Sequence, residues 1–162
     1  MRDELHSSTI VGWREWVKLP GIGVPWIKAK LDTGARSSSL HAFDIEELPG
    51  KGDEGQGRVL FSVRPWQRSV EDVITVECAV HDRRTVRSSS GHAEDRIVVL
   101  VDVELFGRTV TAETTLSNRD QMGFRMLVGR EALRQGFIVD AGRSFLGGRA
   151  PREVRRHNRG RG

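Results

Sequence analysis

The stretch from Lys28 to Ala42, KAKLDTGARSSSLHA, decides how this chain is organised. An alternating run from Trp26 to Leu31 leads into a single carboxylate, Asp32, and the small residues Thr33 and Gly34 follow at once. Small residues after an acid let the backbone turn tightly and bring amide N–H groups close to the carboxylate. The pattern predicts a strand that ends in an exposed aspartate, which serves either as an Asx turn or as a catalytic acid.

A second stretch, FRMLVGREAL at 124–133, combines a short apolar run, a glycine and the start of an amphipathic helix. An Asp-Thr-Gly-Ala loop followed much later by such a segment resembles the retropepsin-like aspartic peptidases. The chain also resembles a bacterial group of that class, often labelled "ATP-dependent zinc protease", which includes the RimB proteins. The matching pieces are VGWREWV (11–17), IKAKLDTGARSSSLHAFD (27–44), VECAVHDRRTVRSSSGHAEDR (76–96), TLSNRDQMGFRMLVGREAL (115–133) and FIVDAGRSFL (137–146).

This resemblance implies a fold in which the late glycine strand crosses beneath the Asp-Thr-Gly loop. A chain of 162 residues with one such loop is too short for a two-lobed enzyme, so a pair of aspartates requires a symmetric dimer. Two carboxylates held close together share one proton, and one then acts as base while the other acts as acid. The implied catalytic residues are Asp32 from each subunit, Thr33 as a brace between the loops, and Gly34, which lets the loops approach.

Short apolar strands separated by glycine-rich turns predict an all-β domain. With the resemblance, the expected fold is a retropepsin-like closed barrel with one short helix near the C-terminal end. We expect a flexible N-terminus at 1–10, the peptidase domain at 11–146 and a disordered Arg/Gly-rich tail at 147–162. The expected strands are 11–19, 26–31, 39–43, 59–63, 70–80, 97–106, 109–116, 126–128 and 137–139, the last paired with 144–146, and the helix is 130–135.

The basic character of the chain is concentrated in its tail. Residues 147–162 hold six arginines and one glutamate and so carry a net charge of +5. The whole chain has a net charge of +4, so residues 1–146 carry a net charge of −1. Nucleic-acid binding is therefore expected only weakly and only through this tail. A single cysteine, Cys78, the absence of an apolar leader and the absence of a membrane-length run favour a cytoplasmic protein.

The polar segment from His81 to Arg96 lies between the two motifs, where retropepsin-like folds place a flap over the substrate. Gly91 would supply mobility, and serines such as Ser90 can hydrogen-bond a peptide backbone. The segment lacks the glycine-rich, apolar character of retroviral flaps, and the alternative is a plain solvated hairpin. Its Ser-Gly-His sequence lacks the Gly-x-Ser-x-Gly elbow of a serine nucleophile.

Arginines gather near these motifs and favour an anionic substrate, because guanidinium groups bind carboxylates with two parallel hydrogen bonds. RimB-like proteins are associated with ligases that add glutamates to the C-terminus of a ribosomal protein. The resemblance thus implies a peptidase for such glutamate-rich tails. The alternative is that these arginines pair with local acids on the surface. The predicted substrate-binding residues are Arg36, Arg87, Ser90, Gly91, Arg96 and Arg125.

The sequence argues against a second catalytic aspartate in the same chain and against a metal or nucleotide site. Asp140-Ala141-Gly142 echoes Asp32-Thr33-Gly34, but it lies between short apolar runs and is typical of a hairpin turn. The five histidines and Cys78 form no His-Glu-x-x-His or Cys-x-x-Cys pair, and no P-loop is present. The sequence therefore predicts no metal and no cofactor.

The sequence predicts a homodimeric aspartic peptidase whose partners are a peptide or protein substrate and a second copy of itself, and not a membrane. The alternative is a non-catalytic module that binds an acidic peptide or ribosomal partner on the same fold.

Overall fold

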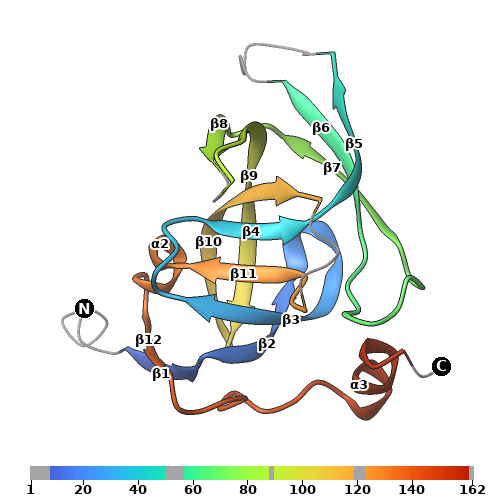
Figure 1. Ribbon diagram of the computed structural model, residues 1–162. Helices are drawn as coiled ribbons and strands as arrows, with labels where there is room; N and C mark the ends of the chain where they lie inside the picture. Colours follow the sequence, from blue (N-terminus) through green and yellow to red (C-terminus); the bar gives the residue numbers. More distant parts are fainter. Residues whose placement is uncertain (1–7, 50–56, 88–89, 119–122, 161–162) are drawn as a thin grey trace.

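The computed structural model describes residues 8–49, 57–87, 90–118 and 123–160 (Figure 1). The residues outside these ranges include 1–7 of the expected flexible N-terminus, 88–89 of the predicted flap segment and 161–162 of the predicted tail, together with 50–56 and 119–122. The elements are β1 (Thr9–Gly12), β2 (Arg14–Leu19), η1 (Pro20–Ile22), β3 (Val24–Asp32), β4 (Ser38–His41), β5 (Phe43–Leu48), β6 (Arg58–Val63), β7 (Ile74–Ala79), β8 (Asp82–Arg87), β9 (Ala93–Leu105), β10 (Arg108–Ser117), β11 (Met126–Gly129), α2 (Arg130–Leu133), β12 (Phe137–Asp140) and α3 (Arg152–Asn158).

The main sheet closes into a ring, which confirms the predicted all-β, barrel-like fold. Its strand order is β10-β4-β11-β3-β2-β9-β8, and an additional pairing of β10 with β9 brings the sheet back to its first strand. Strands β4, β11 and β3 lie side by side on one wall of the ring (Figure 1). A separate three-stranded sheet, β5-β6-β7, projects from this ring, and β1 pairs with β12 alone.

Alternation along β3 separates the core from the functional face. Ile27, Ala29 and Leu31 are buried in the ring, whereas Lys28, Lys30 and Asp32 are partly exposed on the other side. Successive side chains of a strand point to opposite faces, so Lys28, Lys30 and Asp32 form one row outside the core. The antiparallel pairing of β2 with β3 around η1 confirms the predicted first hairpin.

The predicted pairing of 137–139 with 144–146 is wrong. β12 pairs in parallel with β1, and Ile138 lies opposite Ile10. The chain after Asp140 is instead held by Glu15, a fully buried carboxylate on β2. Its oxygens accept hydrogen bonds from the backbone N–H groups of Gly12 (2.7 Å), Leu146 (2.8 Å) and Gly147 (3.1 Å). Glu15 thus supplies the hydrogen-bond acceptors for Leu146 and Gly147 that a strand paired with β12 was expected to supply.

The expected disorder of 147–162 is also wrong for most of that segment, and α3 is a helix additional to the one predicted. Asn158 of α3 is buried and makes two hydrogen bonds of 2.8 Å to Gln67, accepting from its backbone N–H and donating to Oε1. His157 stacks on Trp66 with ring centroids 6.0 Å apart. These contacts order a segment whose composition alone predicts disorder.

Within the residues that the structure describes, no helix is both long enough and apolar enough to cross a membrane.

Candidate active site

The Asp32 loop is a tight turn closed by its own carboxylate. The backbone N–H of Gly34 donates to Asp32 Oδ1 at 2.9 Å, and that of Ala35 donates to Asp32 O at 3.3 Å. Asp32 is partly exposed, and Thr33 and Gly34 are exposed. The Asx turn expected from the sequence is therefore present. It orients the carboxylate of a partly exposed residue.

The glycine strand β11 holds this loop from below. Its Gly129 lies opposite Asp32 in a parallel register with β3, and its N–H donates to Ser38 Oγ at 3.0 Å. A Cβ atom on Gly129 would lie 2.5 Å from Ser37 O, so only glycine fits this crossing. The loop is also tied to the start of α2, where the N–H of Arg130 donates to Ala35 O at 2.7 Å. The side chain of Ser38 and the backbone of Gly129 and Arg130 thus hold the Asp32 loop in place.

The predicted flap segment contains β8 and the start of β9, which form a hairpin. The base of this hairpin is joined to the Asp32 loop. Arg84 Nη1 donates to Ser37 Oγ at 3.1 Å, while its other nitrogens contact Asp82 (3.0 Å) and Glu113. The hydrogen bond from Arg84 lowers the pKa of Glu113. Gly91 adopts a left-handed backbone with φ of 87° at the exposed turn between the two strands.

The predicted substrate-binding residues do not form one cluster. Arg36 is highly exposed and pairs with Glu131 at 3.4 Å. Arg96 pairs with Glu94 at 3.4 Å and lines a cavity of about 370 Å³ under the hairpin, where Arg83 also pairs with Glu47 at 2.6 Å. The remaining hairpin residues, Arg87, Ser90 and Gly91, are exposed near its tip. Several of these arginines have acidic neighbours, as the alternative interpretation expected.

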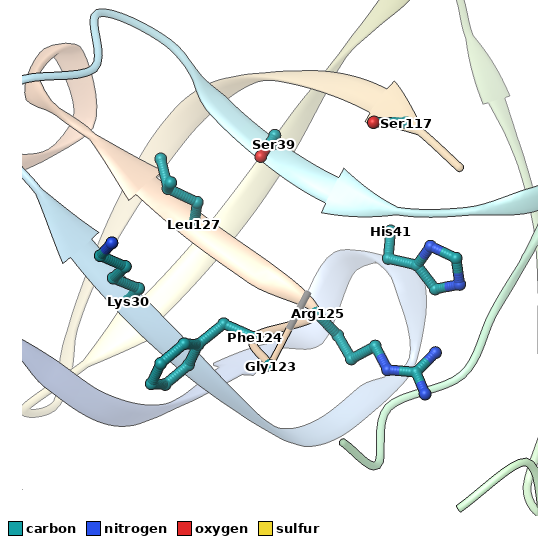
Figure 2. Close-up of a pocket in the computed structure, with 8 residues that line it drawn as sticks. All are labelled: Lys30, Ser39, His41, Ser117, Gly123, Phe124, Arg125 and Leu127. Atoms are coloured by element: carbon teal, nitrogen blue, oxygen red, sulfur yellow. The ribbon is translucent and has the colours of Figure 1, made fainter. Parts of the chain in front are cut away.

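Arg125 occupies a different place, in a cleft on the outer face of β3, β11 and β4 (Figure 2). The cleft has a volume of about 280 Å³. It is lined by Lys30, Ser39, His41, Ser117, Gly123, Phe124, Arg125 and Leu127. In Figure 2, Lys30 and Phe124 lie on one side and Arg125 and His41 on the other, with Leu127 and Ser39 between them. The site therefore combines an apolar floor with basic groups at both ends.

Register explains how this cleft relates to Asp32. Leu127 lies opposite Lys30 in β3 and opposite Ser39 in β4, so the three side chains form one row across the sheet. The next row toward the loop holds Gly129 and Asp32. Because residues two apart on a strand are separated by about 6.6 Å, the cleft begins directly beside the aspartate.

The model of the family "Retropepsin-like aspartic endopeptidase RimB" matches residues 10–150. The chain belongs to this RimB-like family. It is 44% identical over 149 residues to a probable alpha-L-glutamate ligase of Shewanella pealeana, and 46% identical over 136 residues to one of Parasynechococcus marenigrum. These matches cover 91% and 84% of the chain but 32% and 28% of the relatives, so the chain spans about a third of their length.

A solved structure of similar fold is protein Lpg0085 of Legionella pneumophila, described as a protein of unknown function. The two share 27% sequence identity and a TM-score of 0.71, and the match covers 87% of this chain and 99% of the other. The fold shared with this structure therefore extends through most of the chain.

Several cleft residues of this RimB-like chain were missed by the sequence interpretation. Lys30 could have been found, because it lies two residues before Asp32 on the same strand face. His41 and Ser117 are neighbours only through the parallel pairing of β4 with β10, which no local pattern indicates. Groups of three or more His, Cys, Asp or Glu side chains placed to hold a metal do not occur among the described residues.

Proposed function

We propose that this chain is an aspartic peptidase in which Asp32 from each of two subunits forms one site. The observation that carries the proposal is the Asp32 loop, whose carboxylate is oriented by Gly34 and supported by the Gly129 crossing. In such a pair, one carboxylate takes a proton from water as the oxygen attacks the peptide carbonyl, and the other donates a proton to the departing amide nitrogen. No covalent intermediate is needed.

A second subunit is required to complete this chemistry. Thr33 and Gly34 are exposed beside Asp32, which leaves the loop accessible to its equivalent in another copy. Ile10 and Ile138 lie opposite each other on β1 and β12, and each is 56% exposed. An exposed apolar pair on a two-stranded sheet supports a contact between subunits at this edge.

The substrate that we propose is an acidic peptide, such as a glutamate-rich C-terminal tail added to a ribosomal protein. Lys30, His41 and Arg125 place basic groups in the cleft beside Asp32, which suits carboxylate side chains. The relatives named probable alpha-L-glutamate ligases support the same substrate class, since a hydrolase for glutamate-linked tails would act on the products of such enzymes. With such a substrate, we propose that the reaction takes place in the cytoplasm.

The test is cleavage of a glutamate-tailed peptide, followed by mass spectrometry. Wild type, wild type with chelator, Asp32→Asn and Asp140→Asn are compared. Asp140→Asn is a matched control, because the N–H of Gly142 donates to Asp140 Oδ1 at 2.9 Å in the same kind of turn. We expect Asp32→Asn to lower the rate by about 10²-fold or more, with the other three arms equal. Undiminished cleavage by Asp32→Asn overturns the proposal, and loss with chelator indicates a metal-dependent reaction.

A second candidate is a binding module that holds an acidic tail without cutting it. The observation that favours it is that this chain matches about a third of the length of proteins named as probable ligases. In such a protein, the matching segment would hold the growing tail. This candidate predicts that wild type and Asp32→Asn bind the glutamate peptide equally and that neither cleaves it.

A further inference from the structure

A second basic cluster lies farther along the outer face of β3, around Lys28. It surrounds a small cavity of about 100 Å³. The cavity is lined by Trp16, Lys28, Phe145, Arg149, Arg155, Asn158 and Arg159. Burial lowers the pKa of Lys28, and the neighbouring charges of Arg14, Arg159, Arg149 and Arg68 lower it further. Lys28, Arg149, Arg155 and Arg159 thus share one small cavity, where their like charges repel one another.

These cations have no acidic partner within the part of the chain that the structure describes. They contact rings and neutral acceptors instead. Lys28 Nζ lies 5.4 Å from the ring centroids of both Trp16 and Phe145, and the Arg149 guanidinium lies 5.5 Å from that of Phe145. Arg14 stacks on Phe145 at 5.1 Å. Like charges gathered without a counter-charge disfavour the folded state, and a bound anion would relieve their repulsion.

The cluster forms because α3 is docked in an ordered position against the rest of the chain. Asn158 is fixed to Gln67, and Arg155 Nε donates to Ala150 O at 3.1 Å, which holds the helix start against its own turn. The segment from β12 runs along one side of the molecule to α3, beneath β3 (Figure 1). Arg149, Arg155 and Arg159 therefore reach Lys28 from a separate, ordered element.

Spacing connects this cluster to the proposed catalytic residue. Lys28, Lys30 and Asp32 alternate on the same face of β3, so Lys30 is about 6.6 Å and Lys28 about 13 Å from Asp32 along the strand. An extended peptide repeats its side chains on one face with the same period. Lys28 lies over the rings of both Trp16 and Phe145. Nucleobases need open aromatic faces for stacking, so this arrangement favours a peptide with several carboxylates over a nucleic acid.

We infer that the Lys28–Arg149–Arg155–Arg159 cluster is an exosite for the distal carboxylates of an extended acidic peptide whose scissile bond lies at Asp32. The inference rests on the proposed peptidase function. It predicts a preference for long acidic peptides, because a segment shorter than about four residues beyond the cleaved bond cannot span the distance to Lys28.

The test measures kcat/KM at low salt for a short and a long glutamate peptide, of about four and twelve residues. Lys28→Gln/Arg149→Gln is compared with Arg134→Gln/Arg152→Gln, which removes the same charge from exposed positions outside the cavity. We expect the ratio of kcat/KM for long over short peptide to fall about tenfold in the first variant, as for two lost charged contacts. The control should keep the wild-type ratio. Equal ratios in all three proteins overturn the exosite.

A binding arm separates the exosite from the peptidase proposal. Fluorescence anisotropy with labelled long peptide is measured in the Asp32→Asn background, with and without Lys28→Gln/Arg149→Gln. A Kd that rises about tenfold supports the exosite even if wild type cleaves nothing, and an unchanged Kd overturns it even if wild type cleaves. A single-stranded RNA of similar length is the competitor. If RNA binds more tightly than the peptide and depends on Lys28 and Arg149, the assignment to acidic peptide is wrong.

Discussion

Gly129 lies directly opposite Asp32, and its missing side chain is what lets β11 pass beneath the Asp32 loop. A Cβ atom there would sit 2.5 Å from Ser37 O and 3.0 Å from Ala35 O, which are backbone atoms of the segment that follows Asp32. Neither can move without shifting the loop that orients Asp32. The crossing therefore couples the stability of the barrel to the geometry of the proposed site.

We predict that Gly129→Ala lowers the free energy of unfolding by about 1–3 kcal/mol, since overpacking against backbone forces a local shift. The same variant should lose most of its peptidase activity. Urea unfolding and peptide cleavage measure the two effects. Gly21→Ala is the control, because its nearest contact would be Asp102 at 3.7 Å and it should unfold like wild type. A stable and fully active Gly129→Ala would contradict the role of this crossing.

A second prediction concerns Glu15, the buried acceptor of three backbone N–H groups. Glu15→Gln replaces one accepting oxygen by an amide donor, so at least one of these N–H groups loses its partner. We expect a loss of about 1–3 kcal/mol in the free energy of unfolding, measured by urea denaturation. Glu104→Gln is a suitable comparison, because Glu104 pairs with Lys18 at 3.9 Å on the surface and should cost less than about 1 kcal/mol. Equal effects of the two variants would mean that Glu15 does not anchor the chain after β12.

The sequence predicted the elements whose signals are local. Alternation identified β3, and the Gly-Arg step after an apolar run identified β11 and α2. Asp32 and Asp140 show the limit of such signals, because both form Asx turns with the same 2.9 Å hydrogen bond. The glycine opposite each turn does not separate the two either, because Gly12 lies opposite Asp140 as Gly129 lies opposite Asp32, and a Cβ atom on either glycine would lie 2.5 Å from a backbone oxygen. What separates them is the cleft beside Asp32, which the fold assembles from distant strands.

The features that the sequence missed depend on contacts between distant residues. The turn at Asp140 favours a hairpin locally, but Glu15 captures the following amides. The arginine-rich segment after Gly147 predicts disorder by composition, yet Asn158 and Gln67 order it. The cleft could not be assembled either, because His41 and Ser117 meet only through the register of β4 with β10.

A third prediction tests that docking. Asn158→Ala leaves the N–H and side-chain carbonyl of Gln67 without their present partner. We expect a loss of about 1–3 kcal/mol and faster proteolysis of the C-terminal segment. Thermal unfolding and limited proteolysis measure these effects, and Arg152→Ala, an exposed change on the same helix, should show neither. Truncation after Gly148 should likewise destabilise the chain, because it removes His157 from Trp66.

A fourth prediction concerns Lys30, the basic group of the cleft nearest to Asp32 along β3. Lys30→Gln should raise KM for a glutamate peptide by about three- to tenfold, as expected for one charged contact, and leave cleavage of a neutral peptide less affected. The difference should shrink as salt is added, because ions screen exposed charges. Lys18→Gln, on another strand, provides the comparison. Equal losses for acidic and neutral peptides would argue against recognition of carboxylates in the cleft.

The last prediction concerns pH and the base of the β8–β9 hairpin. The pKa of Glu113 is lowered from 4.5 mainly by its hydrogen bond with Arg84. The pKa of Asp82 is lowered from 3.8 by the backbone N–H of Arg83 and then by Arg84. A carboxyl whose pKa is lower in the folded state contributes stability above its unfolded pKa and loses it as the pH falls through the folded pKa. Arg84 therefore stabilises the hairpin at neutral pH and less so in acid.

We expect Arg84→Met to be less stable than wild type by about 1 kcal/mol near pH 7. This difference in the free energy of unfolding should stay constant down to about pH 4.5 and then narrow. Protonation of Glu113 weakens its pairing with Arg84 in wild type, and the variant already lacks that pairing. Urea midpoints measured across this range test it, with Arg87→Met, an exposed change on the same strand, as the control. A gap that is independent of pH would show that Arg84 acts through Ser37 and packing alone, and that its pairing with Glu113 contributes no stability.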